Sequence, residues 1–124
     1  MKTAESSGGA AGSWPAQISE TAVLVLLKER WSHGYRLHEK LRELGVPAGD
    51  LSRLYRSLRK MEADGIVTSR WDTEAPRKGP ARRIYTLTRA GSRQLRDRIG
   101  ALRVNAEVMH RIGSQYVGSV GELA

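Results

Sequence analysis

The stretch that decides the fold is Asp50–Gly65, which reads DLSRLYRSLRKMEADG. On a helical wheel of about 100° per residue, its apolar side chains fall within about 80° of one another and form one stripe: Leu51, Leu54, Leu58 and Met61. Arg53, Arg56 and Lys60 fall within about 60° on the opposite face, with Ser57 beside them. The segment therefore predicts a helix that buries one face and presents a cationic face to a polyanion.

Both ends of this helix carry the residues that helix ends favour. Asp50 is a good N-cap because its carboxylate accepts hydrogen bonds from free backbone N–H groups. Gly65 is a good residue for the left-handed turn that closes a helix. A solvated surface helix on a basic protein is the alternative interpretation. The segregation of the charges, and the sequence that follows Gly65, favour a binding surface.

The composition limits the class of protein. The chain has 124 residues, a net charge of +8 and no cysteine, and its sequence pI is about 10.4. This predicts one domain and an anionic partner, either nucleic acid or an anionic membrane surface. No apolar run reaches the roughly 18 residues of a membrane span, and no secretory signal precedes the body. We expect a cytoplasmic protein, associated with the nucleoid when bound to DNA, and no membrane partner.

Neither a metal site nor an active site is expected. The histidines, His33, His38 and His110, are scattered, and none has a partner carboxylate at a familiar metal-ligand spacing. No nucleophile, base and orienting group occur together, so Ser32 and His33 are read as structural residues at a helix start. We therefore expect no cofactor, no metal and no catalytic residue.

The chain begins with a segment that lacks periodic apolar residues. Residues 1–17 are rich in Ser, Gly and Ala and predict a disordered arm, in which Trp14 stands alone. Ile18–Arg30 predicts a first helix, with Ser19 or Thr21 as its cap. The apolar centre of this helix also fits a buried strand, but the charged flanks and the total length favour a helix.

A second helix and a tight turn precede the cationic helix. His33–Leu44 predicts a helix capped by Ser32 and ended by Gly45. Its apolar positions are Leu37, Leu41 and Leu44. Val46–Gly49 is a short turn containing proline and glycine. Two short helices joined in this way, with the second one cationic outside, are the outline of a helix-turn-helix.

A basic hairpin follows the cationic helix. Ile66–Trp71 and Arg82–Leu87 alternate as strands do, and the segment between them, Asp72–Ala81, contains two prolines and a glycine. Four positive charges lie on this hairpin: Arg77, Lys78, Arg82 and Arg83. Such a loop can be a plain solvated turn. Directly after a cationic helix, it is more typical of a DNA-contacting wing.

The last helix has the pattern of a dimerisation seam. Thr88 caps a helix predicted over Arg89–Ile112, in which Gly91 and Gly100 each cost about 1 kcal/mol relative to alanine. Its apolar residues recur at a and d positions: Leu95, Ile99, Leu102, Ala106 and Met109. Packing on its own domain is the alternative, but the arginines on its other face favour a projecting helix that joins two copies. Residues 113–124 are expected to be a flexible tail.

The predicted fold is therefore mainly α with a small β-hairpin, that is, a winged helix-turn-helix over residues 18–88 with a C-terminal dimerisation helix over residues 89–112. With these elements in place, the chain resembles the PadR family of bacterial transcriptional regulators. The matching segments are Val23–Leu27, Ser32–Tyr35, Leu54–Val67, Trp71–Thr73, Gly79–Tyr85 and Leu87–Gly91. Together they cover about Ile18–Arg96 in the family's order. The wing segment is most similar to members described as polyhydroxybutyrate-responsive repressors.

The resemblance implies a homodimer, joined by its C-terminal helices, that binds a palindromic operator and is released by a small-molecule effector. It carries recognition-helix contacts onto Ser52, Arg53, Tyr55 and Arg56, and wing contacts onto Arg82 and Arg83. The sequence departs from the family at Leu51–Arg53, where Pro-Gly-Thr is usual, and at Trp31, where proline is common. Because Arg53 adds a long donor at the helix start, the bases read are expected to differ.

The expected DNA contacts follow from the helix geometry. Arg53 and Arg56 are the candidates for guanine edges, and Arg59 and Lys60 lie further along the helix, where phosphates are expected. The full set of predicted DNA-binding residues is Ser52, Arg53, Tyr55, Arg56, Arg59, Lys60, Arg77, Lys78, Arg82 and Arg83. A protein-interaction module without its own operator is the second hypothesis, and a membrane-surface or RNA-binding protein is the third. Trp14, Trp31 and Trp71 line an effector pocket or are plain core residues.

Overall fold

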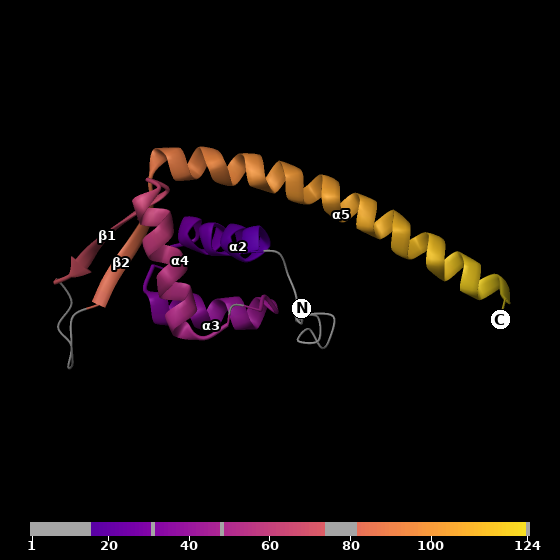
Figure 1. Ribbon diagram of the computed structural model, residues 1–124, viewed down its shortest axis with the longest axis horizontal. Helices are drawn as coiled ribbons and strands as arrows, with labels where there is room; N and C mark the ends of the chain where they lie inside the picture. The colour runs from indigo at the N-terminus through magenta and orange to yellow at the C-terminus, as the bar shows by residue number, and fades with distance from the viewer. Residues whose placement is uncertain (1–15, 31, 48, 74–81, 124) are drawn as a thin grey trace.

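The computed structural model describes residues 16–30, 32–47, 49–73 and 82–123, and side chains between 17 and 120 within those ranges. The elements in chain order are α2 (Ala16–Lys28), α3 (Gly34–Leu44), α4 (Leu51–Ala63), β1 (Val67–Asp72), β2 (Arg82–Leu87) and α5 (Arg89–Leu123). The order confirms the predicted winged helix-turn-helix followed by a long C-terminal helix (Figure 1). The predicted arm up to residue 15, with Trp14, and also Trp31, Arg77 and Lys78 lie outside the described residues.

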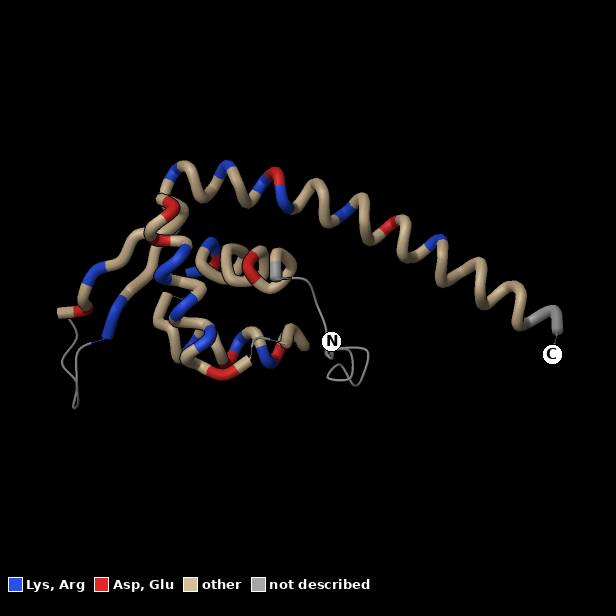
Figure 2. The backbone as a smooth tube through the Cα atoms, viewed as in Figure 1, with Lys and Arg blue, Asp and Glu red and all other residues tan. Residues whose placement is uncertain are grey.

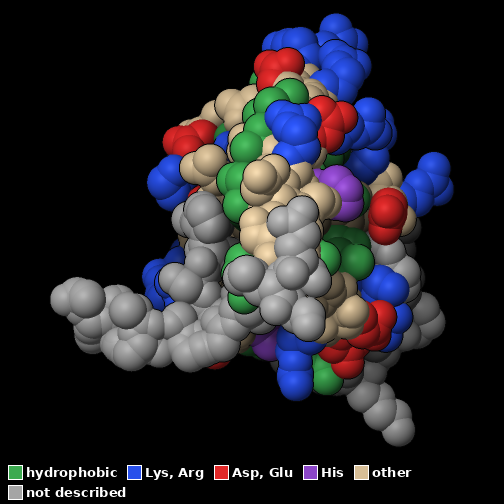
Figure 3. Space-filling view, turned by 90° about the vertical axis from the view of Figure 1, so that its right-hand side faces the viewer, with side chains coloured by type: hydrophobic (Ala, Val, Ile, Leu, Met, Phe, Trp, Pro, Cys, Tyr) green, Lys and Arg blue, Asp and Glu red, His purple; other side chains and the backbone are tan. Residues whose placement is uncertain are grey.

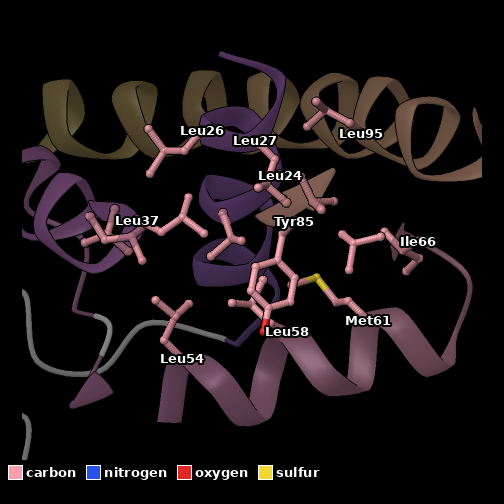
Figure 4. Close-up of a cluster of buried hydrophobic side chains, with 14 residues drawn as sticks. Leu24, Leu26, Leu27, Leu37, Leu54, Leu58, Met61, Ile66, Tyr85 and Leu95 are labelled. Carbon is pink, nitrogen blue, oxygen red and sulfur yellow. The ribbon is translucent and has the colours of Figure 1, made fainter. Parts of the chain in front are cut away.

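Helix α2 is the centre of the core. It lies between α5 and the pair α3 and α4, and it contributes Leu24, with no exposed surface, together with its neighbours Leu26 and Leu27 (Figure 4). From α4, Leu54, Leu58 and Met61 are 3%, 0% and 2% exposed. The apolar stripe predicted for the cationic helix is thus confirmed.

Two turns of the same type place the ends of α3 and α4. At each, a glycine in the left-handed region donates its N–H to the carbonyl three residues back, and the next residue donates its N–H to the carbonyl five residues back, which is the Schellman arrangement. Gly45 (φ 84) bonds to Arg42 O and Val46 to Leu41 O. At the end of α4, Gly65 and Ile66 bond to Glu62 O and Met61 O in the same way. The turn after α3 brings Val46 into the core, whereas Leu44, the last of the three apolar positions of this helix, is 58% exposed.

The hairpin is a two-stranded antiparallel sheet. Its register pairs Val67 with Leu87 at the base and Asp72 with Arg82 at the outer end. Asp72 was predicted in the connecting loop, but it is the last residue of β1 and is only 7% exposed. Asp72 pairs with Arg82 in the sheet, and His33 Nε2, at the start of α3, lies 3.3 Å from its carboxylate oxygen.

Several helix boundaries differ from the sequence prediction. Helix α2 begins at Ala16, so Ala16 and Gln17 are not part of an arm. Ser19 and Thr21 are not caps, because both lie inside the helix, where Thr21 Oγ1 donates to Gln17 O at 2.7 Å. The helix ends at Lys28 rather than Arg30, since Arg30 adopts a left-handed φ of 78°.

The N-cap of α3 is also one residue later than predicted. His33, in an extended conformation, occupies the cap, and its side chain makes no capping hydrogen bond. Ser32 contacts the hairpin, since its carbonyl oxygen accepts a hydrogen bond from the Tyr85 N–H at 2.9 Å. This backbone contact and the His33–Asp72 contact together fasten the start of α3 to the wing.

Helix α5 starts on the body and then projects beyond it (Figure 1). Thr88 caps it as predicted, because Thr88 Oγ1 accepts from the Gly91 N–H at 2.9 Å. An ion pair between Arg98 Nη1 and Glu20 Oε1, at 3.5 Å, joins the first part of α5 to α2. The helix continues to Leu123, so the predicted end at Ile112 and the flexible tail are wrong. Gly113 and Gly118 each weaken a helix without stopping it, and no proline follows.

The two glycines in the first part of α5 have opposite surroundings. A Cβ at Gly91 would collide with the carbonyl oxygen of Ile66, whereas a Cβ at Gly100 would meet open space. We expect Gly91→Ala to lower the free energy of unfolding by about 1–3 kcal/mol through overpacking. Gly100→Ala is expected to raise it by up to about 1 kcal/mol, because alanine is the better helix former. Urea unfolding followed by circular dichroism measures both, and equal effects of the two substitutions would contradict this packing.

Candidate nucleic-acid interface

The outward face of α4 carries the largest group of predicted DNA-binding residues. Ser52, Arg53, Arg56, Arg59 and Lys60 are all exposed. Lys and Arg residues also recur along the hairpin next to α4, as the charge-coloured backbone shows (Figure 2). Lys60 Nζ lies 3.4 Å from Asp64 on the surface, and such an exposed pair contributes little to stability. The Arg and Lys side chains of α4 point to solvent because the apolar stripe on the opposite side of the helix packs on the core.

The first turn of α4 is fixed by its cap. Asp50 Oδ1 accepts from the Arg53 N–H at 2.9 Å, which confirms the predicted N-cap. Within the part of the chain that the structure describes, no carboxylate lies within ion-pair distance of the guanidinium of Arg53 or of Arg56. Their guanidinium N–H donors are therefore not engaged by acidic groups of the described ranges.

Tyr55 lies at the boundary between the cationic face and the core. It is half-buried and packs against the core. Its ring covers Gly34 at the start of α3, since a Cβ built there would lie 2.6 Å from the Tyr55 hydroxyl oxygen. Gly34 thus leaves the space that the Tyr55 ring occupies at the start of α3.

A chain of polar contacts joins the wing to α4. Ser69 Oγ on β1 donates to the Glu62 carboxylate of α4, at 2.9 and 3.1 Å from its two oxygens. The same hydroxyl accepts from Arg83 Nη1 at 3.1 Å. The Arg83 guanidinium also lies over the Trp71 ring, 4.5 Å from its centroid, which is a cation–π contact. Arg83 is therefore held in place although it is exposed, while Arg82 beside it is exposed without such contacts in the described part of the chain.

A pocket of about 410 Å³ lies between the wing, α4 and the start of α3. Its aromatic lining is Tyr35, Tyr55, Trp71 and Tyr85, and its cationic lining is Arg59, Arg82 and Arg83. Burial raises the pKa of Tyr85 above its usual value, and Arg83 opposes this rise, so Tyr85 is neutral near pH 7. Trp71 is 53% exposed, so it is a pocket residue and not a core residue.

The predicted dimerisation seam divides into two parts. Leu95 is 8% exposed and Ile99 is half-buried, and both pack on the core of their own chain. Leu102 is half-buried, whereas Ala106 and Met109 are exposed. Beyond Leu102, α5 displays further apolar side chains that the seam did not include: Val104, Val108, Ile112, Val117 and Val120. The view toward the free end of α5 shows hydrophobic side chains at the surface between Lys and Arg side chains (Figure 3).

No metal-binding group was found among the described residues, where no three His, Asp or Glu side chains come together. Within the same ranges, none of the helices has the length and apolarity to cross a bilayer.

The fold and this cationic face define a winged helix-turn-helix protein. The model of the Transcriptional regulator PadR-like family matches residues 23–97, so the chain belongs to that family. Members of the family are DNA-binding transcriptional regulators and not enzymes. A comparison with curated proteins gives no match.

Solved structures agree with this assignment. A PadR-like regulator from Bacillus cereus ATCC 14579 is 21% identical, with a TM-score of 0.69 over 78% of this chain and 92% of that one. A PadR family regulator from Eggerthella lenta DSM 2243 is 26% identical, with a TM-score of 0.60 over 76% and 82%. One from Clostridium difficile R20291 is 23% identical, with a TM-score of 0.63 over 74% and 96%. The likenesses below 25% identity concern the fold alone.

Sequence reasoning missed the residues that work through long-range contacts. Ser69 is hydrogen-bonded to both Glu62 and Arg83, but nothing in the spacing of these three residues indicates that they meet. The apolar residues on the outer part of α5 had a detectable signal, because Val104, Val108, Ile112 and Tyr116 recur every four residues. The predicted seam started from Leu95 and Ile99, and its spacing therefore did not include this stripe.

The polar chain between wing and recognition helix gives a test of stability. We expect Ser69→Ala to lower the free energy of unfolding by about 1–2 kcal/mol, since a hydrogen bond to a charged carboxylate is lost. Thr68→Ala is the matched control on the same strand; Thr68 is exposed, so its replacement should change stability by less than about 0.5 kcal/mol. Urea unfolding compares the two variants, and a Ser69→Ala protein as stable as the control would exclude a role for this contact.

Proposed function

We propose that the protein is an effector-responsive repressor that binds a palindromic operator in double-stranded DNA as a homodimer. The observation that carries the proposal is the face of α4: five exposed polar or cationic residues stand opposite an apolar stripe of which Leu54, Leu58 and Met61 are buried. In the family's fold such a helix enters the major groove with its N-terminal residues against base edges.

In this complex, Arg53 and Arg56 read guanine edges, a contact worth about 1–3 kcal/mol of discrimination each. Ser52 and Tyr55 contact either a phosphate or a base at the edge of the groove. Arg59 and Lys60 neutralise phosphates, and the wing residues Arg77, Lys78, Arg82 and Arg83 add backbone or minor-groove contacts.

The alternative is a winged-helix module that binds another protein and has no operator. It requires no segregated cationic face, and the arginines of the first turn of α4 would then be surface charges only. Substitution of the two candidate base-reading residues separates the two functions.

The test uses duplexes selected from a random-sequence pool by the wild-type protein. Arg53→Ala with Arg56→Ala should abolish the preference for the selected sequence, because the two side chains proposed to read base edges are removed. Arg93→Ala with Arg96→Ala removes the same charge at the same spacing from exposed positions of α5 and should leave sequence preference intact. Retained sequence-specific binding by the α4 variant would exclude the proposed recognition helix.

The dimer contact is assigned to the outer part of α5. Apolar side chains such as Val104, Ile112 and Tyr116 are 61%, 64% and 69% exposed, and they line one side of a single projecting helix. Monomeric proteins rarely expose a contiguous apolar surface of this kind. Val108, Ile112 and Tyr116 also border a shallow, open depression along this side of the helix. Leu95 is excluded from this contact by its burial in its own chain.

We expect Ile112→Glu to convert the dimer to monomers, since a buried unpaired carboxylate at the contact is costly. Ser114→Glu adds the same charge about 160° away on the helix and should leave the dimer intact. Sedimentation equilibrium measures both masses. A wild-type protein that is monomeric at all concentrations, or two variants of equal mass, would argue against this interface.

An effector is accommodated by the pocket that Trp71 lines. The predicted effector residues Trp14 and Trp31 lie outside the described residues, so Trp71 alone supports this part of the proposal. The aromatic and guanidinium lining suits a planar anion. Because Arg59, Arg82 and Arg83 line the pocket and are also proposed DNA contacts, a bound effector would compete with DNA directly.

A further inference from the structure

The turn before α4 holds a close contact between a glycine and the first long side chain of the recognition helix. Gly49 has a φ of 70°. A Cβ built on it would lie 2.6 Å from Arg53 Cδ, 3.3 Å from Nη1 and 3.5 Å from Cβ. The Arg53 side chain therefore lies back across the turn, in space that exists only because residue 49 has no side chain.

Both partners of this contact are held at their backbones. The Arg53 N–H is bound by the Asp50 carboxylate. On the other side, His38 Nε2 lies 2.9 Å from the Gly49 carbonyl oxygen, so a donated hydrogen bond from α3 fixes the turn. The contact is thus a feature of the helix-turn-helix unit and involves no wing residue.

Electrostatics does not explain the position of this side chain. The N-terminal end of a helix carries partial positive charge and disfavours a cation. No acidic group among the described residues pairs with Arg53. The close contact with Gly49 accounts for the position of the side chain, and no acidic group of the described residues engages the donors of its guanidinium.

We propose that Gly49 is a positioning residue for base recognition, which selects the Arg53 conformation that meets the operator without touching DNA itself. This inference rests on the proposed function. Specificity at one base pair of each half-site is then set by a residue of the turn together with a residue of the helix.

The experiment is a double-mutant cycle with a matched control. Gly45 has the same left-handed conformation (φ 84°), but a Cβ there meets nothing within 4 Å. Gly49→Ala and Gly45→Ala are each made in the wild-type and in the Arg53→Ala background. Affinity is measured for the duplex selected by the wild-type protein and for a random duplex.

We expect Gly49→Ala to weaken binding to the selected duplex by about ten-fold, the scale of one bidentate base contact, and to leave random-duplex affinity within about two-fold. In the Arg53→Ala background the same change should cost less than about two-fold, because the partner is gone. Gly45→Ala should stay within about two-fold in both backgrounds.

The inference is overturned if Gly49→Ala is as harmless as Gly45→Ala, or if its cost persists without Arg53. A wild-type protein that selects no sequence overturns the proposed function and this inference with it, so the two failures are distinguishable. If circular dichroism shows that Gly49→Ala is unfolded, Gly49→Asn against Gly45→Asn decides by the same criteria, because asparagine tolerates the left-handed conformation and still carries a Cβ.

Discussion

The packing of one side of α4 on the core is the contact on which the rest of the structure depends. Burial of Leu54, Leu58 and Met61 is worth about 1.5–3 kcal/mol for each side chain. Repulsion between neighbouring like charges on a helix surface costs only about 0.2–0.5 kcal/mol per pair. The apolar stripe therefore decides how the helix is rotated, and the arginines opposite it are turned to solvent. The cationic face is a geometrical consequence of the core.

The carbonyl of Ile66 then relates this helix to the rest of the chain. It accepts from both the N–H and the hydroxyl of Thr88, and Gly91 packs directly on it. The end of α4, the base of the wing and the start of α5 consequently meet at one point. Because a Cβ at Gly91 would collide with the Ile66 carbonyl, the start of α5 lies directly against the end of α4 and the base of the wing. In the proposed dimer, contacts on the outer part of α5 would set the separation of the two α4 helices and hence of the half-sites.

The sequence was informative wherever local rules decide the structure. The 3.6-residue period placed the helices, and the caps at Asp50 and Thr88 and the left-handed turn at Gly65 are as predicted. It was insufficient where distant segments compete for a group. Ser32 is a residue type that caps helices, but the cap is His33, and the Ser32 backbone is bonded to Tyr85 of the hairpin. Asp72 belongs to β1 because it pairs with Arg82, and His33 lies beside its carboxylate. The predicted dimerisation seam of α5 includes Leu95, which is buried in the core of its own chain for a related reason. An apolar stripe that packs on the core and one that forms a dimer contact have the same period, and only the position of α2 tells them apart.

Arg83 and Arg53, two arginines of the proposed interface, differ in how their side chains are held before DNA binds. Arg83 is already ordered by Ser69 and the Trp71 ring, so it loses little conformational freedom when it contacts DNA. Ordering a long side chain at an interface otherwise costs about 0.5–1.5 kcal/mol. Arg53 lies against Gly49, and no acidic group of the described residues pairs with its guanidinium. A fixed charge on the wing suits the regular phosphate backbone, whereas unpaired donors at the start of α4 suit base edges, where hydrogen-bond geometry discriminates. The wing is thereby suited to set the register of the complex, and the first turn of α4 to read its sequence.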